Sequence, residues 1–414
     1  MHLKSLMSKY WGELVYVFSN TYTLIITMVT SVVATAFIVP ADLGVIQTVL
    51  LFQVYFGFFH LGVFNGLNRN LAFYKAQGNF SLVQDMVNTT YTVSYVVAIL
   101  GALFSIGLFL YYLIIGKGIV YLLSALLLLI LQILQPLTNA VETTYRSGQE
   151  FKRLGVIKNI ESTLYAAFTI FPIILGYIGK IIADSLKSII GYILRYTKRP
   201  YPRTGFGSKK SLELLIKTGA PMLVSGYLWT VFAACDRTYI ASHFGMEEMG
   251  LYVISGYVIT AVMAVPTAVN TLLYPKAAAR YGKNGDVREL KNFWGKSLLL
   301  YVAMLIPLCA ILFFLLPPLV ETFLPKYVGG IKASQYSLLT CMTFVYRGPS
   351  VLFGTLRRNT IYIILLAFSI VAFWGAAMVF NNKITTIESV SLLRFYISLV
   401  QMIIIVIVTY IYVK

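Results

Sequence analysis

Apolar residues dominate this chain in long runs that short polar segments interrupt. A helix needs about 20 consecutive, mainly apolar residues to cross a bilayer. Twelve stretches approach or exceed that length, at about residues 14–39, 43–66, 86–112, 119–141, 156–178, 181–196, 213–240, 249–273, 294–317, 331–354, 359–380 and 387–412. The pattern therefore predicts an all-α polytopic membrane protein with about twelve transmembrane helices.

The composition agrees with this prediction and adds an orientation. The chain is 58% hydrophobic and only 12% charged, with 33 Lys+Arg against 15 Asp+Glu. If the N-terminus is cytoplasmic, about three quarters of the basic residues fall in cytoplasmic segments, as the positive-inside rule requires. We therefore expect a bacterial cytoplasmic (inner) membrane protein with both termini in the cytoplasm. The excess of basic residues then needs no nucleic acid partner.

The sixth stretch is the least apolar, because Asp184 and Lys187 lie within residues 181–196. If it did not cross, the very basic segment that follows would face outward and every later loop would invert. The positive-inside rule favours a crossing, although the sequence leaves open whether this segment crosses fully.

A basic segment rich in proline and glycine lies near the middle of the chain, at residues 195–210, and is typical of a flexible cytoplasmic linker. The sequences on its two sides resemble each other when Gly78 is aligned with Gly285. This repeat predicts two pseudo-symmetric six-helix bundles around a central cleft, which is a transporter architecture. The expected domains are an N-terminal bundle at 1–196, the linker at 197–211 and a C-terminal bundle at 212–414.

Polar side chains form stripes on several predicted spans. The stripes include Asn20, Gln53, Asn65, Ser225, Trp229 and Asn270. A polar group that faces lipid is costly, so such stripes face other helices or a water-filled cavity. The alternative is ordinary hydrogen bonding between helices. Stripes on corresponding spans of both halves favour the cavity.

Charged residues lie near the expected ends of the spans. Glu142, Glu161 and Asp236 are candidates for gates at the two mouths of a cleft, and Arg69 is a candidate contact for an anionic ligand. The alternative for each is snorkelling or a local ion pair. His60 lies at mid-membrane and is a candidate proton-coupling group, with a neutral, hydrogen-bonded histidine as the alternative.

Motifs for catalysis are missing from the sequence. It contains no GxxxxGK[ST], no GxGxxG after a strand, no GxSxG and no HExxH, and its three cysteines have no metal-binding spacing. We therefore expect no catalytic residues, no metal and no cofactor, and we expect a protein that is not an enzyme. A proton or sodium gradient remains open as an energy source.

Motifs in both halves resemble the Wzx-type flippases of the polysaccharide transporter family, in the multidrug/oligosaccharidyl-lipid/polysaccharide export superfamily. In the second half they are Gly219 and Pro221, Asp236 and Arg237, Gly250 and Tyr252, then Pro275, Ala277–Ala279 and Gly282. In the first half the segment ADLGVIQTVLLFQVYFGFFHLGVFNGLNRNLAFYKAQGN is similar, with Arg69 at the family's arginine. The resemblance covers about three quarters of the chain and fades after about residue 355.

This resemblance implies flipping of an undecaprenyl-diphosphate-linked oligosaccharide to the outer leaflet, for O-antigen or capsule assembly. A polar, cationic cleft can shelter a diphosphate and sugars that hydrocarbon excludes. On this hypothesis the diphosphate or acidic sugars contact Arg69, Arg146 and Arg237. The sugars contact the polar stripe residues Asn20, Gln53, Asn65, Ser225, Trp229 and Asn270. Membrane lipids, a polysaccharide polymerase and a chain-length regulator are the other partners that it implies.

Other functions stay open. An ion-coupled multidrug-type exporter of the same superfamily would need an acidic residue deep in the first half, and none lies between Glu13 and Asp42. A membrane glycosyltransferase or polysaccharide polymerase would need a large charged outer loop, and the expected outer loops are short. A non-transporting scaffold of a glycan assembly complex leaves the polar stripes unexplained. Flipping of lipid II is a related activity of proteins that usually carry extra spans.

Overall fold

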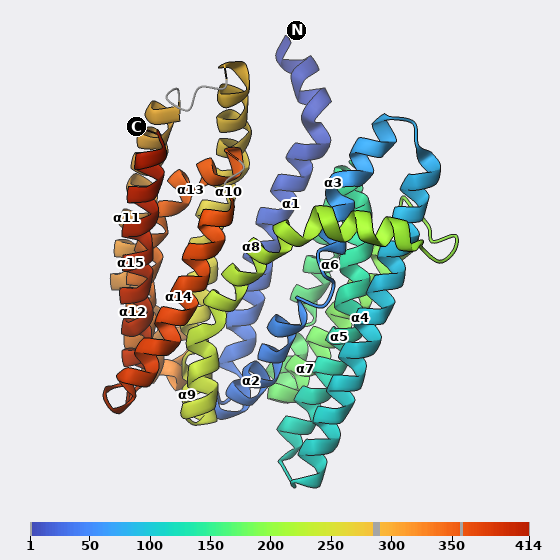
Figure 1. Ribbon diagram of the computed structural model, residues 1–414. Helices are drawn as coiled ribbons and strands as arrows, with labels where there is room; N and C mark the ends of the chain where they lie inside the picture. Colours follow the sequence, from blue (N-terminus) through green and yellow to red (C-terminus); the bar gives the residue numbers. More distant parts are fainter. Residues whose placement is uncertain (1, 285–289, 357–358, 414) are drawn as a thin grey trace. The chain divides into compact units, whose positions relative to one another are not determined.

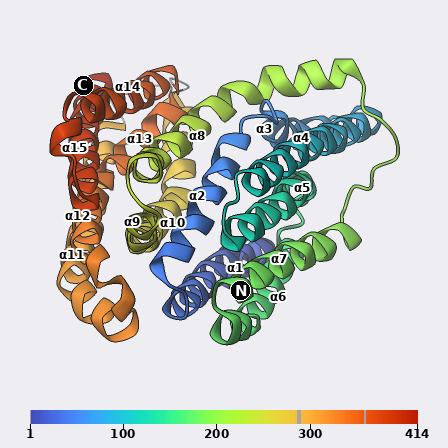
Figure 2. The ribbon, with the colours of Figure 1, turned by 90° about the horizontal axis from the view of Figure 1, so that it is seen from below.

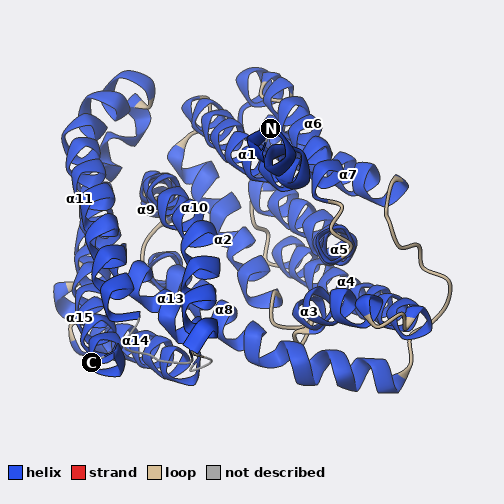
Figure 3. Cartoon of the chain, turned by 90° about the horizontal axis from the view of Figure 1, so that it is seen from above, coloured by secondary structure: helices blue, strands red, loops and turns tan. Residues whose placement is uncertain are grey.

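The computed structural model describes residues 2–284, 290–356 and 359–413, and Gly285 of the expected repeat lies outside them. Within these ranges the chain consists of helices joined by loops and has no strand (Figure 3). This arrangement follows from the apolar pattern, because a helix satisfies its own backbone hydrogen bonds without water. The expectation of an all-α fold is confirmed.

Two compact units divide the chain. The first contains Met1–Ile38 and Val49–Tyr227, and the second contains Val39–Thr48 and Leu228–Lys414. These boundaries differ from the expected division at the linker. The start of α2 (Pro40–Phe56) belongs to the second unit, and the first half of α8 (Lys209–His243) belongs to the first.

Close backbone crossings account for this exchange of segments. On α8, Gly219 packs against Gly62, so that a Cβ atom at Gly219 would overlap the Gly62 carbonyl. On α2, Gly44 packs in the same way against the carbonyl of Met246. Glycine allows two helices to approach this closely, and the contact holds each segment to the unit that it touches.

Eight helices among the described residues are long and apolar enough to cross a membrane. They are Val15–Ala36 in α1 (His2–Ala36), α4 (Phe80–Ile114), α5 (Ile119–Ser147), α8, Met246–Thr267 in α9 (Met246–Leu251) and α10 (Val253–Asn284), α11 (Leu290–Phe323), Thr360–Val379 in α14 (Asn359–Val379) and Ile387–Tyr412 in α15 (Ile387–Val413). Each coincides with one of the expected spans. The chain is a multi-pass membrane protein.

The other four expected spans are helical but shorter, bent or interrupted. The second expected span is divided into α2, which has only 17 residues, and α3 (Val63–Ala76), with a turn between them. The fifth and sixth correspond to α6 (Phe151–Ala167) and α7 (Ile170–Thr197), which meet at a bend of 93°. The tenth is divided into α12 (Ile331–Met342), η3 (Thr343–Tyr346) and α13 (Arg347–Thr355). The remaining short elements are η2 (Pro325–Gly330) and η4 (Asn381–Lys383).

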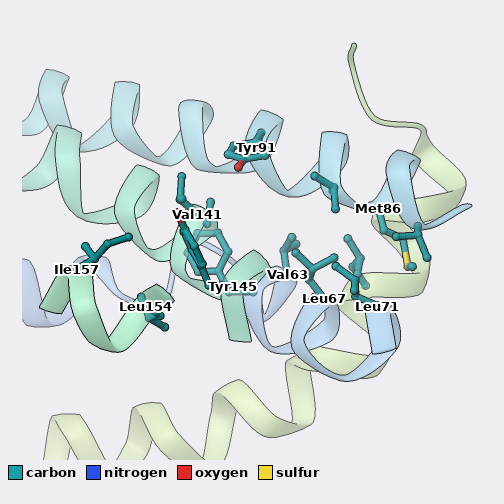
Figure 4. Packing of buried hydrophobic residues seen from close by; sticks show 14 residues of the cluster. Val63, Leu67, Leu71, Met86, Tyr91, Val141, Tyr145, Leu154 and Ile157 are labelled. Carbon is teal, nitrogen blue, oxygen red and sulfur yellow. The ribbon is translucent and has the colours of Figure 1, made fainter. Parts of the chain in front are cut away.

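In the first unit, α4 and α5 form a helical hairpin (Figure 1), and α1, α6 and α7 lie side by side (Figure 2). A buried apolar cluster joins α3, α4, α5 and α6 (Figure 4). Its labelled members are Val63, Leu67, Leu71, Met86, Tyr91, Val141, Tyr145, Leu154 and Ile157. The cluster fixes the ends of α5 and α6 that carry the charged residues described below. In the second unit, α12 packs against α10, α11 and α15.

The basic linker is not free, contrary to the expectation of a flexible segment. Its backbone and side chains bind the first turns of α4 through three hydrogen-bonded pairs. They are Gln84 Nε2 to Pro202 O at 2.8 Å, Tyr91 OH to Tyr201 O at 3.2 Å, and Thr204 N to Asn88 Oδ1 at 3.0 Å. The composition of the linker predicted flexibility. It could not show the hydrogen-bond partners on α4, because these come from a distant part of the chain.

Asp85 of α4 forms hydrogen bonds with the end of this linker, at the start of α8. Its carboxylate accepts hydrogen bonds from the Ser208 amide at 3.2 Å and from the hydroxyls of Ser208 and Ser211. We expect Asp85→Ala to cost about 1–3 kcal/mol, because hydrogen bonds to a charged acceptor are lost. The thermal midpoint in detergent should fall, and trypsin should cut faster at the linker. Glu213→Gln, which alters an exposed carboxylate 4.0 Å from Lys209, should change neither reading. Equal effects of the two variants would contradict this role of Asp85.

Candidate functional site

Four charged residues follow one face of α7. Lys180, Asp184, Lys187 and Arg195 are spaced by four, three and eight residues, so they recur at helical intervals. In the sequence, Asp184 and Lys187 only weakened the expected sixth span. In the structure all four side chains line a cavity inside the first unit. The charges are compatible with a membrane helix because they face this cavity.

The course of α7 brings this face against α6. Gly176 has φ 57° and ψ −128° and interrupts the helix, because this backbone conformation is one that glycine adopts readily. The segment after it spans about 30 Å at 1.5 Å per residue. It folds back along α6, so that Asp184 contacts Tyr165 and Arg195 contacts Glu161.

The cavity has a volume of about 340 Å³ and receives side chains from α1, α2, α5, α6 and α7. Its lining comprises Thr27, Ser31, Gln53, Leu131, Leu134, Gln135, Thr138, Glu161, Tyr165, Lys180, Asp184, Lys187, Ser188, Gly191 and Arg195. Three of these residues are basic and two are acidic, and most of the others are polar. The structure therefore unites parts of two expected polar stripes, from α1 and α2, with charges that the sequence reading had not assigned to a site.

Three charged residues of the cavity lining form a compact group with Tyr165. Lys180 Nζ lies 2.9 Å from Asp184 Oδ2, and the Tyr165 hydroxyl donates to Asp184 Oδ1 at 2.7 Å. The ammonium of Lys187 lies 4.1 Å from the centre of the Tyr165 ring. Among the described residues no carboxylate lies within 4.0 Å of Lys187, and Asp184 and Glu161 are the nearby carboxylates that interact with its charge.

Arg195 and Glu161 of the cavity lining also belong to an ion-pair network that joins α1, α5, α6 and α7. Arg195 Nη1 lies 2.6 Å from Glu161 Oε2, and Arg195 Nε lies 3.4 Å from Glu142 Oε2. Lys158 Nζ lies 3.1 Å from Glu142 Oε1 and donates to Asn20 Oδ1 at 3.1 Å. The four charged side chains are only 6–16% exposed. The network unites the expected gating residues Glu142 and Glu161 with Asn20, which was expected to contact sugar.

Arg69 and Arg146 do not reach this cavity. Both are exposed, and among the described residues neither has a carboxylate within 4.0 Å. Arg146 lies one helical turn beyond Glu142 on α5, and Arg69 lies in α3. Both therefore carry exposed charges on the first unit.

Three other expected site residues lie outside the cavity, and two of them form hydrogen bonds with residues close in sequence. His60 lies in the turn between α2 and α3, where its Nδ1 accepts a hydrogen bond from the Gly62 amide at 3.1 Å. The Ser225 hydroxyl donates to the Met222 carbonyl at 3.1 Å. Asn65 is partly buried in α3. The structure brings none of the three into the cavity.

In the second unit, Asp236 belongs to a buried core. Its Oδ2 accepts a hydrogen bond from the Tyr252 hydroxyl at 2.8 Å, and its Oδ1 lies 3.7 Å from Arg394 Nη1. Asp236 and Arg394 are 2% and 4% exposed. The guanidinium of Arg394 also stacks over the Phe232 ring at 4.1 Å.

Arg237, the next residue, lines a separate small cavity of about 150 Å³ in the second unit. Gln47, Met249, Tyr252, Val253, Gly256, Tyr257 and Thr260 complete its lining. Two further expected residues have defined partners in this unit. Asn270 Oδ1 accepts from the Tyr301 hydroxyl at 2.7 Å, and Trp229 stacks against Arg347 at 4.1 Å.

Sequence reasoning missed Lys180 and Lys187 as site residues and assigned Arg195 to the linker. A signal was present, because the four charges of α7 recur at helical spacing within a mainly apolar segment. A charged face of that kind inside a membrane helix indicates a polar interior. The partner side chains from α5 and α6 could not be inferred from spacing.

Solved structures with a similar fold are membrane transporters. An inward-facing multidrug resistance MATE transporter of the MOP superfamily matches with a TM-score of 0.72 and 15% identity, over 94% of this chain and 93% of that one. An outward-facing structure matches at 0.67 and 14%, over 97% and 95%. A MOP superfamily transporter from Pyrococcus furiosus matches at 0.64 and 15%, over 97% and 94%. The chain therefore has the fold of the MOP superfamily transporters.

The family comparison is more specific. The family described as "Polysaccharide biosynthesis protein" matches residues 32–327, which is most of the chain. The protein belongs to this family, and the resemblance to polysaccharide transporters is confirmed. No curated protein matches the sequence.

Proposed function

We propose that this protein flips undecaprenyl-diphosphate-linked oligosaccharides from the cytoplasmic to the outer leaflet by alternating access, for O-antigen or capsule assembly. The observation that carries this proposal is the charged cavity of the first unit, where no described carboxylate lies within 4.0 Å of Lys187, in a member of a polysaccharide biosynthesis family. A fold shared with transporters supports it.

The chemistry of the cavity suits such a ligand. Diphosphate and sugar hydroxyls cannot enter hydrocarbon without losing their hydrogen bonds to water. Lysine and arginine side chains replace those bonds for a diphosphate, while carboxylate, amide and hydroxyl groups replace them for sugars. The cavity offers both kinds of group, from Lys187 and Arg195 to Gln53 and Ser31. The polyprenyl tail would stay in the lipid.

Under the same proposal, the expected arginines outside the cavity contact the ligand and the expected glutamates act as a gate. Arg69 and Arg146 would attract the diphosphate, since both are exposed cations, and Arg237 would contact an anionic part of the ligand in the second unit. Glu142 and Glu161 would act as a gate, because a change in their pairing with Arg195 and Lys158 would alter the charge that faces the cavity. Both termini and the linker would lie in the cytoplasm of a bacterial inner membrane, with a polymerase and a chain-length regulator as partners.

An ion-coupled small-molecule exporter is the second candidate. The fold shared with multidrug resistance transporters favours it. The same cavity would then bind a small organic molecule, with a proton or sodium ion exchanged at its carboxylates. The two candidates differ in the ligand that crosses, which can be tested on one preparation.

Leaflet-resolved transport tests the proposal. The purified protein is reconstituted into vesicles with a diphosphoundecaprenyl oligosaccharide on one leaflet, and an added glycosidase reports how much glycan reaches the other. We expect exposure that depends on the protein. If several glycans fail and the same vesicles accumulate a fluorescent drug under an ion gradient, the exporter function replaces the flippase function.

Lys187 provides the most direct test of the cavity. We expect Lys187→Gln to slow flipping about tenfold or more, because a charged hydrogen bond to the diphosphate is lost while the side chain keeps its polarity. The rate of glycan exposure measures this. Lys332→Gln, at an exposed lysine of α12, should leave the rate unchanged. An unchanged rate in Lys187→Gln would remove this cavity from the proposed path.

A further inference from the structure

The tenth expected span changes its helix type in the second unit. The α-helix α12 ends at Met342, the 3-10 turn η3 follows, and α13 begins at Arg347. A short 3-10 segment inside a helix often marks a hinge or local strain, and interrupted spans in transporters often carry the ligand site. Arg347 is the first residue after this interruption and is therefore a candidate ligand contact.

Arg347 has aromatic contacts in place of a counter-ion. Its guanidinium lies 4.1 Å from the centre of the Trp229 ring and 5.9 Å from that of Phe344. Its Nε is buried and has no hydrogen-bond partner within the described ranges, and no described carboxylate lies within 4.0 Å of it. Arg195 and Arg394, which are also enclosed in the helical units, each face a carboxylate. Arg347 thus lacks the anion that the other two possess.

Three tyrosines lie near Arg347, and two of them, Tyr301 and Tyr346, are fully buried. The phenol groups of Tyr301, Tyr346 and Tyr362 lie within range of its charge. Tyr301 also donates to Asn270. Arg347 and Trp229 are both partly exposed.

We infer that Trp229 and Arg347 form a binding site for the oxyanion of a carbohydrate, either a sugar carboxylate or a sugar-linked phosphate. The inference rests on the proposed function, since it names a part of the transported ligand. A guanidinium without a counter-ion inside an expected membrane span is costly, and an oxyanion would offset that cost through charge-assisted, two-pronged hydrogen bonds. Because the guanidinium lies over one face of the Trp229 ring, a pyranose would stack on the opposite face of the indole.

Binding to the purified, detergent-solubilised full chain tests the site without transport. The probes are glucose 1-phosphate, glucuronate, inorganic phosphate and neutral glucose, with quenching of tryptophan fluorescence and ligand-detected NMR as the readings. We expect glucose 1-phosphate or glucuronate to bind more tightly than glucose, and the preferred one identifies the source of the oxyanion. Arg347→Gln should weaken that binding tenfold or more, whereas Lys332→Gln should not change it. Arg347→Lys, which keeps the charge but not the planar pair of donors, should weaken binding less.

Two results would overturn the site. One is unchanged binding in Arg347→Gln. The other is inorganic phosphate that binds as tightly as the sugar phosphate and is unaffected by Trp229→Leu, because the carbohydrate would then make no contact. If Arg347→Gln does not fold, judged by its thermal midpoint, Arg347→Lys and Trp229→Leu supply the same comparison. Probe binding that depends on Arg347 without any glycan flipping would count against the proposed function and leave the site in place.

Discussion

Replacing Arg195 by glutamine is expected to destabilise the first unit by about 3–5 kcal/mol, because the change leaves buried carboxylates without their partner. Arg195 forms the ion pair of Glu161 at 2.6 Å and one of the two ion pairs of Glu142. Glu142 keeps Lys158, so the uncompensated charge falls mainly on Glu161. The thermal midpoint and the urea sensitivity of the purified protein in detergent would measure the loss.

An exposed arginine–glutamate pair provides a matched control, because it shows the effect of losing an ion pair that is not buried. Arg153→Gln also removes an arginine from an ion pair, with Glu150 at 3.5 Å, but these side chains are 63% and 39% exposed. Exposed pairs contribute at most about 1 kcal/mol, so this variant should differ little from the unmodified protein. The double variant Arg195→Gln, Glu161→Gln should recover much of the stability, because it removes both charges. If Arg195→Gln and Arg153→Gln behaved alike, the buried network would not stabilise the unit.

Replacing Asp236 by alanine is expected to have a similar effect on the second unit. The change leaves Arg394, 4% exposed, without its carboxylate and leaves the Tyr252 hydroxyl without its acceptor. Removing one partner of a buried pair typically costs about 3–5 kcal/mol. The expected result is a lower thermal midpoint and a lower yield of folded protein, measured by size-exclusion chromatography after heating.

Tyr252→Phe provides the control for this second prediction. It removes only the hydroxyl that donates to Asp236 at 2.8 Å and keeps the ring in place. A single hydrogen bond to a charged acceptor contributes about 1.5–3 kcal/mol, so the loss should be smaller than in Asp236→Ala. Asp236→Ala combined with Arg394→Met should be more stable than Asp236→Ala alone, and the opposite order would refute the ion pair as the cause.

The length and apolarity of the runs predicted the spans well where one helix crosses without interruption, as in α4, α5, α11 and α15. They were less informative for the segments that became α2, α6 and α7, and α12 to α13. There a glycine, a turn or a 3-10 segment divides the helix, and apolar composition changes little across such a break. Hydropathy measures transfer into lipid, and it does not detect local backbone geometry.

Some residues selected from the sequence lie in the candidate cavity or in its ion-pair network. The stripes on α1 and α2 directed attention to Gln53, which lines the cavity, and to Asn20, which joins the ion-pair network. Glu142 and Glu161 were recognised as charges near the span ends, but their shared partner Arg195 was not, because it lies 34 residues beyond Glu161. Arg69 and Arg146 were selected with the same reasoning, and the structure leaves them outside the cavity.

The sequence by itself determined that this is an all-helical, multi-pass membrane protein and allowed its family to be recognised, because apolar runs of membrane length and short motifs are local properties of the chain. Only the tertiary structure decided what the charged residues do. In the sequence, Asp184 and Lys187 only reduced the apolarity of the sixth expected span. In the structure they line a cavity, and Asp236 belongs to a buried core. A charge in a membrane helix acquires its role from the groups that oppose it, and those groups come from helices that are distant in sequence.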